Sequence, residues 1–314
     1  MRFSLKNPSE KSVLSCEDKM LRLNAGRVVY AVRKFHGYGQ MELAEEFNIS
    51  QSNISKIEAG VLAPDLRFWM DFIRVFRVKD PFCFYYGTAE IDGIPKLGQV
   101  GKNFYKGLTF RIPKHYQTDP VITSRKIRPM IEVLEKTLEK PWHAFLAETK
   151  IPHGIFDILN FPLPGLLIKD LADFFNKHAE KINFGVELNI ETQGNHGLLF
   201  KDYDSSRTPL NVLKHFIQKQ REYGVDFEYT MAQENGDVSS IGIKALPALT
   251  ALVLEKNLPE NIFFNVCAQY PLYLMRMKDA SASLRLIWPS ECRKDEARHH
   301  DLSTAPGKQV LCVA

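Results

Sequence analysis

The sequence predicts a multi-domain chain, with an all-α domain of five helices at residues 21–88 and an α+β domain at residues 127–290. In the first region apolar side chains recur at the spacing of a helix, whereas in the second proline-bounded helical patterns alternate with short strand-like runs. Between them, at residues 89–126, Gly and Pro recur without a regular period, which is typical of a linker. Residues 1–20 are expected to form a flexible arm and residues 291–314 a flexible tail.

Helical patterns fill the first region. A helix is predicted at residues 24–35, and a further one follows at residues 66–76, where the apolar side chains form a stripe of Leu66, Trp69, Ile73 and Phe76. Pro81 starts a short fifth helix that runs through Tyr86.

Residues 40–60 predict two short helices joined by a tight turn. Leu43 lies on the inner face of the first helix and Ile54 on that of the second. Asn48 marks the reversal, because Asn tolerates the left-handed conformation, and Ser50 suits an N-cap. A second helix with small polar side chains on its outer face can enter the major groove of duplex DNA and contact base edges. An ordinary helical hairpin inside a larger domain is the alternative.

The stretch from about residue 21 to residue 86 resembles the Cro/CI-type helix-turn-helix domain of phage repressors and of the XRE family of bacterial regulators. The positions that carry the resemblance are Gln40, Leu43, Ala44, the run Ile54 to Gly60, and the run Pro64 to Leu66. The chain departs from the family pattern at Gly39, where a Ser or Thr cap is usual, and at Asn48 and Arg77, where Gly is usual.

The resemblance implies a role for each polar residue of the hairpin. Gln40, at a helix N-terminus, would hold a phosphate, while Asn53 and Ser55 would touch the DNA backbone. Gln51 and Ser52 would reach bases, and Lys56 a guanine or a phosphate. The DNA-binding set is therefore Gln40, Gln51, Ser52, Asn53, Ser55 and Lys56. Arg33 and Glu58 would form a structural brace between helices.

The second region mixes helices and strands. Helices are predicted at residues 127–138, 142–147, 164–178 and 209–223, and strands at residues 186–192, 198–203, 226–231, 238–243, 263–267 and 284–288. Part of this region weakly resembles the ligand-sensing domain of AraC-type regulators. The motifs that carry this resemblance are Gly185–Val186, Gly197–Phe200 and Thr208–Leu210.

Basic side chains are concentrated between residues 91 and 128, where Lys96, Lys102, Lys106, Arg111, Lys114, Arg125, Lys126 and Arg128 face only Asp92 and Asp119. This segment either neutralises DNA phosphates beside the helix-turn-helix or is a solvated linker. The sequence does not distinguish the two.

Motifs of catalysis are missing from the sequence. It contains no nucleophile elbow, phosphate-binding loop or HExxH pattern, so we expect no enzyme, no catalytic residue and no cofactor.

The chain has five cysteines, an odd number, at irregular spacing, which predicts free thiols and a cytoplasmic location. We expect no metal site, although Cys292 lies near His299 and His300. No apolar run reaches the roughly 20 residues that span a membrane.

The function predicted from these observations is sequence-specific DNA binding by a homodimeric transcription regulator. Its partners would be a pseudo-palindromic double-stranded operator, a second copy of the chain and a small-molecule effector. The aromatic side chains of the second region would line an effector pocket, or else a core or a dimer surface: Phe174, Phe175, Phe184, Phe216, Tyr223, Phe227, Tyr229, Phe263, Phe264, Tyr270 and Tyr273. The alternative function is a helix-turn-helix used as a protein-interaction or scaffolding module, with the C-terminal domain carrying the main activity.

Overall fold

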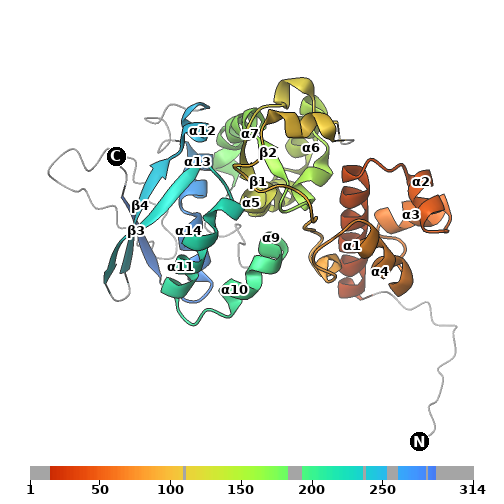
Figure 1. Ribbon diagram of the computed structural model, residues 1–314, viewed down its shortest axis with the longest axis horizontal. Coiled ribbons are helices and arrows are strands. Elements are labelled where there is room, and N and C mark those ends of the chain that lie inside the picture. The colour runs from red at the N-terminus through yellow and green to blue at the C-terminus, as the bar shows by residue number, and fades with distance from the viewer. Residues whose placement is uncertain are drawn as a thin grey trace, which may run out of the picture.

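The computed structural model describes residues 15–108, 111–182, 193–235, 238–252, 261–280 and 282–287. It is mostly helical, with a small β part of two sheets. Three groups of elements follow one another in a row (Figure 1), from α1–α4 at one end, through the middle group around α5–α7, to the sheet β3–β4–β5 at the other. An all-helical N-terminal part before a mixed part agrees with the predicted fold class at this coarse level.

The N-terminal group contains α1 (Cys16–Phe35), α2 (Gln40–Glu46), α3 (Gln51–Glu58), α4 (Leu66–Val75) and the 3₁₀ turn η1 (Cys83–Tyr85). The helices predicted at 40–60 and 66–76 are confirmed. The predicted fifth helix is only a three-residue 3₁₀ turn. Asn48 and Arg77, which stand where the family pattern has Gly, both adopt left-handed conformations, with φ of 51° and 52°.

The start of α1 corrects the prediction of a flexible arm through residue 20. The helix begins at Cys16, because the Ser15 hydroxyl accepts a hydrogen bond from the Asp18 amide at 3.1 Å and caps it. Glu17 and Asp18 in the first turn interact favourably with the helix dipole. Residues 1–14 of the expected arm lie outside the described residues.

The middle group contains η2 (Lys102–Gly107), η3 (Lys114–Tyr116), β1 (Pro120–Thr123), α5 (Ser124–Thr137), α6 (Glu139–Thr149), η4 (His153–Asp157), β2 (Pro162–Pro164), α7 (Gly165–His178) and η5 (Ala179–Lys181). Strands β1 and β2 pair antiparallel, with Thr123 opposite Pro162. The three helices predicted from residues 127 to 178 are confirmed, although α5 starts within the expected linker.

The prediction of a linker at residues 89–126 is wrong, because this segment is packed into the core. Ala89 exchanges backbone hydrogen bonds of 2.8 Å with Asp157 and Leu159. The buried side chains of the segment include Ile91, Tyr105, Ile112, Tyr116 and Val121. In the described part of residues 105–112 the expected strand is not formed, since Tyr105 lies in the 3₁₀ turn η2, and residues 109–110 lie outside the described residues. The Gly and Pro residues of this segment therefore lie in a packed connection and not in a linker.

The C-terminal group contains α9 (Gln193–His196), η6 (Gly197–Leu199), α10 (Phe200–Asp204), α11 (Pro209–Lys219), η7 (Gln220–Glu222), β3 (Phe227–Asn235), β4 (Val238–Ala245), α12 (Pro247–Thr250), α13 (Ile262–Ala268), α14 (Tyr270–Arg276) and β5 (Ser283–Ile287). Strand β3 pairs antiparallel with β4, and β4 pairs parallel with β5. Three predicted strands are therefore confirmed, and the helix predicted at 209–223 is present as α11 and η7.

Two predicted strands are wrong. Residues 198–203 form η6 and α10, and residues 263–267 lie in α13, whose start is capped by the Asn261 side chain. The strand expected at residues 186–192 and the tail at 291–314 lie outside the described residues. Of the motifs that resemble AraC-type regulators, Thr208–Leu210 caps and opens α11, Gly197–Phe200 is helical, and Gly185–Val186 is outside the described residues.

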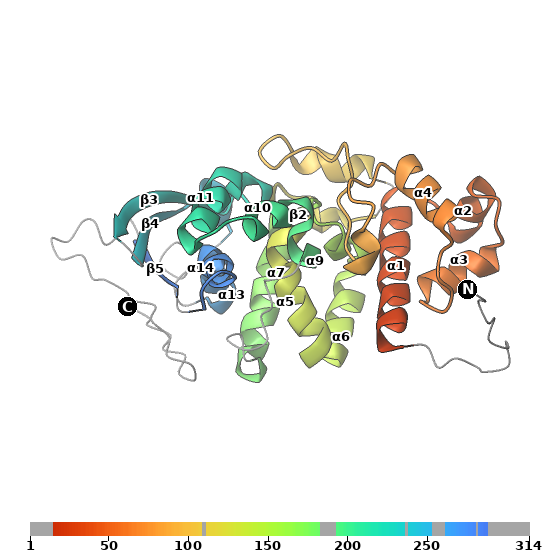
Figure 2. The same cartoon turned by 90° about the horizontal axis from the view of Figure 1, so that it is seen from below.

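Helix α1 joins the N-terminal group to the middle group. It lies between α2–α4 on one side and α5 and α6 on the other (Figures 1 and 2). Gly154 of η4 comes so close to α1 that an added Cβ would be 3.1 Å from Ala31 Cα. Arg27 of α1 binds Asp157 at 2.7 Å and Glu135 at 3.3 Å. The two groups therefore share a packed and charged interface on α1.

Candidate nucleic-acid interface

The α2–α3 hairpin is built by local signals. The Gly39 amide donates a 2.6 Å hydrogen bond to the Glu42 carboxylate at the start of α2, which is the half of a capping box that needs no Ser or Thr side chain. Asn48 then reverses the chain in its left-handed conformation. The Ser50 hydroxyl accepts from the Asn53 amide at 3.1 Å and starts α3. The two helices therefore begin and end where the sequence predicts.

The buried face of α3 packs on α1, and the two backbones approach each other closely. Ile54 and Ile57 are buried there with Leu43 of α2. Gly26 of α1 faces the end of α3, and an added Cβ would lie 2.4 Å from the Ile57 carbonyl oxygen. Sequence reasoning missed this position, although a Gly within an apolar helical stripe is a signal of close backbone approach.

The opposite face of α3 is polar and accessible. Gln51, Ser52, Ser55 and Lys56 are exposed, whereas Asn53 is half-buried. This face carries no large apolar side chain. It offers amide, hydroxyl and ammonium groups, which are the groups that bond base edges and phosphates.

A chain of hydrogen bonds runs from the buried side of the hairpin to its exposed face. Arg33 binds the Glu58 carboxylate with two nitrogens, at 2.5 Å and 2.9 Å, and donates to the Tyr38 carbonyl oxygen at 2.6 Å. Arg33 is 3% exposed and Glu58 is 8% exposed, so the pair is a buried brace between α1 and α3.

Gln40 extends this chain to Gln51 on the exposed face of α3. Its Nε2 donates to Glu58 at 2.8 Å, and its Oε1 accepts from Gln51 Nε2 at 2.6 Å. Sequence reasoning assigned Gln40 to a phosphate, but its side chain lies between Glu58 and Gln51 as a bridge. An amide nitrogen carries two hydrogens, so Gln51 keeps one N–H donor and its Oε1 for a further partner while the bridge fixes its orientation.

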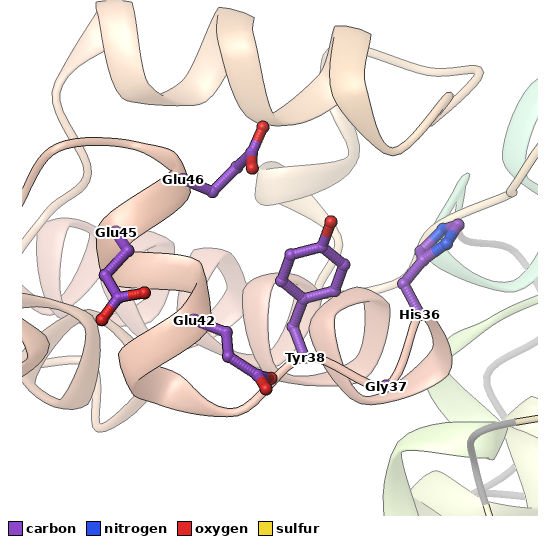
Figure 3. Close-up of a pocket in the computed structure, with 6 residues that line it drawn as sticks. All are labelled: His36, Gly37, Tyr38, Glu42, Glu45 and Glu46. Atoms are coloured by element: carbon purple, nitrogen blue, oxygen red, sulfur yellow. The ribbon is translucent and has the colours of Figure 1, made fainter.

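An acidic hollow of about 550 Å³ lies beside α2 and is lined by His36, Gly37, Tyr38, Glu42, Glu45 and Glu46. Figure 3 shows the three glutamates projecting from α2, with the Tyr38 ring between Glu42 and Glu46 in this view. Burial lowers the pKa of His36, so its ring is neutral near pH 7 and does not offset the carboxylates. Phosphates would be repelled here.

The C-terminal end of the basic segment at residues 91–128 is neither a phosphate-binding surface nor a solvated linker, which were its two predicted roles. Arg125 pairs with Glu90 at 2.9 Å and Lys126 with Asp226 at 2.5 Å. Arg128 lies 3.3 Å from both Glu135 and Asp157. Because all three cations are at most 2% exposed, they are core ion pairs and not phosphate ligands. The exposed cations of the segment are Lys96, Lys102, Lys106, Arg111 and Lys114.

The aromatic side chains of the second region mostly fill its core. Phe216, Tyr223 and Tyr270 are fully buried and pack on one another. A second hollow, of about 470 Å³, is lined by His115, Tyr116, Phe145, Glu148, Thr149, Asp170, Asp173, Phe174 and Lys177. Of the predicted pocket residues, Phe174 alone lines it, and Phe184 lies outside the described residues.

Titratable and metal-binding groups add no further site within the described ranges. No cluster of three or more His, Cys, Asp or Glu side chains suited to a metal ion occurs among those residues. Burial raises the pKa of the Cys267 thiol to about 12, so it remains protonated at neutral pH. Cys292, His299 and His300 lie outside the described residues. None of the helices in the described part combines the length and apolarity needed to cross a bilayer.

Comparison with protein-family models, with curated proteins and with solved structures gives no match for this chain.

Proposed function

We propose that the chain is a sequence-specific DNA-binding transcription regulator, in which α1–α4 and η1 form a Cro/CI-type helix-turn-helix domain. The observation that carries the proposal is the exposed polar face of α3, held from behind by the buried Arg33–Glu58 pair. In this proposal α3 enters the major groove. Gln51 and Ser52 read bases, Lys56 contacts a guanine or a phosphate, and Asn53 and Ser55 contact the backbone.

The bridge through Gln40 supports this assignment. A side chain that must bond adenine through two atoms reads it best when its orientation is fixed before binding. Gln51 receives that orientation from Gln40, which is itself held by Glu58. In this proposal Gln40 therefore positions Gln51, in place of the phosphate contact that the sequence predicted for it.

One short helix reads few bases, so the regulator would act as a homodimer on two half-sites about 34 Å apart. The middle and C-terminal groups would dimerise, bind an effector, or do both. The hollow beside α6 and α7, of about 470 Å³, has the size of small-molecule sites. Its location within the packed middle group, which also contacts α1, would let a ligand there favour one arrangement of α1 over another.

The test is selection of bound duplexes from a random pool, followed by gel shifts at two salt concentrations. Gln51→Ala should weaken binding to the selected duplex by about 1–3 kcal/mol and relax the preference at one base position. Gln99→Ala, a change of an exposed glutamine remote from α3 in sequence, is the matched control and should leave affinity unchanged. Absence of binding to any duplex at low salt would remove the proposal.

Lys56→Ala separates the two roles of that side chain. A phosphate contact predicts weaker binding to all sequences and a salt slope smaller by about 1, whereas a guanine contact predicts a loss confined to the selected sequence. Lys140→Ala, an exposed lysine on α6 outside both the hairpin and the basic segment, is the control. The protein-interaction alternative predicts that neither lysine affects duplex binding.

A further inference from the structure

The hollow of about 470 Å³ in the middle group combines carboxylates with aromatic rings. Three elements form it, namely η3, α6 and α7. Glu148, Asp170 and Asp173 supply carboxylates to its lining. Lys177 is the only lysine or arginine among the described residues that line it. The fixed charge of the lining is therefore negative, which favours a cationic ligand.

The two buried hydroxyl groups of the lining already donate their hydrogens within the fold. The Tyr116 hydroxyl donates to Asp170 Oδ2 at 2.6 Å, and the Thr149 hydroxyl donates to the Phe145 carbonyl oxygen at 2.8 Å. Tyr116 is 2% exposed and Thr149 is 9% exposed. Burial and the hydrogen bond to Asp170 raise the pKa of Tyr116, so the phenol keeps its proton at neutral pH. A hydroxyl has one hydrogen, so both groups can only accept from a ligand in the hollow.

Acceptors thus dominate the polar lining, because ionised carboxylates also only accept. The side chains of the lining that can donate are His115 and Lys177, and both are exposed. Lys169 lies 3.6 Å from Asp173, but these side chains are 45% and 65% exposed, so the pair is weak and leaves the carboxylate accessible. A ligand that matches this lining carries a positive charge and N–H donors.

Phe145 and Phe174 give the hollow an apolar wall. Their ring centroids lie 4.8 Å apart, and Trp142 stacks on Phe145 at 5.6 Å. Aromatic faces pack against hydrocarbon and attract ammonium groups. A metal ion would leave this wall uncovered, whereas an amine with a hydrocarbon part would cover it.

We infer that this hollow binds a small protonated organic amine. Its ammonium group would lie among the carboxylates of Glu148, Asp170 and Asp173, and its hydrocarbon part against Phe145 and Phe174. That such an amine is the effector of the regulator rests on the proposed function.

Packed side chains connect the hollow to α1. The Trp142 ring, which stacks on Phe145, lies 5.6 Å from the ring of Phe156 in η4. The same element carries Gly154, where an added Cβ would be 3.1 Å from Ala31 Cα of α1. An amine bound against Phe145 therefore lies close to the element that packs on α1. It would change DNA affinity if it bound two arrangements of α1 with different affinity.

The test is calorimetry of the full chain at neutral pH with 2-phenylethylamine as the probe. The matched compounds are neutral 2-phenylethanol, anionic phenylacetate, and (2-phenylethyl)trimethylammonium, which keeps the charge but has no N–H. The amine should bind at least about tenfold more tightly than each of them, because charge-assisted hydrogen bonds to carboxylates are the stronger ones. Equal binding of the four compounds, binding of Mg²⁺ in place of the amine, or no amine binding at millimolar concentration overturns the inference.

Two substitutions with effects of opposite sign locate the binding. Glu148→Gln removes a carboxylate from the hollow and should raise the Kd of the amine about threefold or more, whereas Lys177→Gln removes the cation and should lower it about two- to fivefold. Glu139→Gln, an exposed carboxylate on the same helix as Glu148 but outside the lining, is the matched control and should leave the Kd unchanged. Thermal unfolding establishes that each variant is folded. A folded Glu148→Gln variant that binds like the wild type, or a Lys177→Gln variant that binds more weakly, overturns the inference.

Gel shifts with and without the amine separate this site from the proposed function. A chain that binds the amine with the expected variant pattern but binds no duplex refutes DNA binding and supports the amine site. A chain that binds duplex but no amine refutes the amine site alone. Amine binding that leaves the duplex affinity unchanged refutes the role of the amine as effector.

Discussion

Basic side chains of α3 and α5 occupy opposite environments. Lys56 on α3 is exposed and has no ion-pair partner in the described part of the chain. Arg125, Lys126 and Arg128 on α5 are 1%, 1% and 2% exposed, and each contacts at least one carboxylate. A free exposed cation can neutralise a phosphate, whereas a buried paired cation is committed to the fold. The local density of Lys and Arg in a sequence therefore does not locate a nucleic-acid interface.

The difference between the buried and the exposed cations should be largest in the free energy of unfolding. Lys126→Ala leaves the buried Asp226 carboxylate without its cation and should lower the free energy of unfolding by about 3–5 kcal/mol. Lys56→Ala should change it by less than about 0.5 kcal/mol. Denaturant unfolding measures both values. Replacing the pair together, with Lys126→Met and Asp226→Leu, should recover much of the loss, and a mild effect of Lys126→Ala alone would show that the pair is not committed to the fold.

A second prediction concerns the packed rear of α3. Gly26→Ala forces the new Cβ against the Ile57 carbonyl oxygen and should cost about 1–3 kcal/mol of stability, because backbone cannot yield as a side chain can. Gly107→Ala places a Cβ in open space and is the matched control. Thermal unfolding of the two variants gives the comparison. Equal stability of both would mean that α1 and α3 do not approach as closely as described.

The smallest expected effect is a pH dependence at the interface of α1 with the middle group. Burial raises the pKa of Glu135, but the hydrogen bond from His153 and the charges of Arg128 and Arg27 outweigh it, so the pKa is held well below its usual value. A carboxyl group whose pKa is lower in the folded than in the unfolded protein stabilises the fold at pH values above its unfolded pKa. This stability is lost as the pH falls from the unfolded pKa towards the folded pKa.

Glu135→Gln should therefore flatten the acid side of the curve of stability against pH, as measured by thermal unfolding between neutral pH and pH 3. Glu139→Gln, which removes an exposed carboxylate at the start of α6, should leave the shape of that curve unchanged. An acid limb that is the same in the Glu135→Gln variant and the wild type would contradict the role of this cluster.

Elements with a complete local signal were predictable from the sequence. The hairpin at residues 40–60 combines helical spacing, the Ser50 cap and an Asn at the turn, and each signal acts within a few residues. The α13 segment also had such a signal in Asn261, whose side chain accepts from the Phe264 amide at 3.2 Å. It was misread because a short run of aromatic and β-branched residues suits a strand or a buried helix equally well.

The sequence by itself therefore determined helices α2, α3 and α4, the Ser50 cap and the polar character of the α3 face, since these depend on residues a few positions apart. It did not determine the start of α1 or the extent of the fifth helix. Tertiary structure alone decided which charges are buried and which segments are packed. Arg125 meets Glu90, and Lys126 meets Asp226 about a hundred positions away, only after the chain has folded. Likewise, Arg33 of α1 meets Glu58, which anchors the bridge through Gln40 to Gln51, where Gly26 lets α3 lie against α1. Local pattern fixes an element, but partners distant in sequence fix the environment of each side chain, and that environment decides what the side chain can bind.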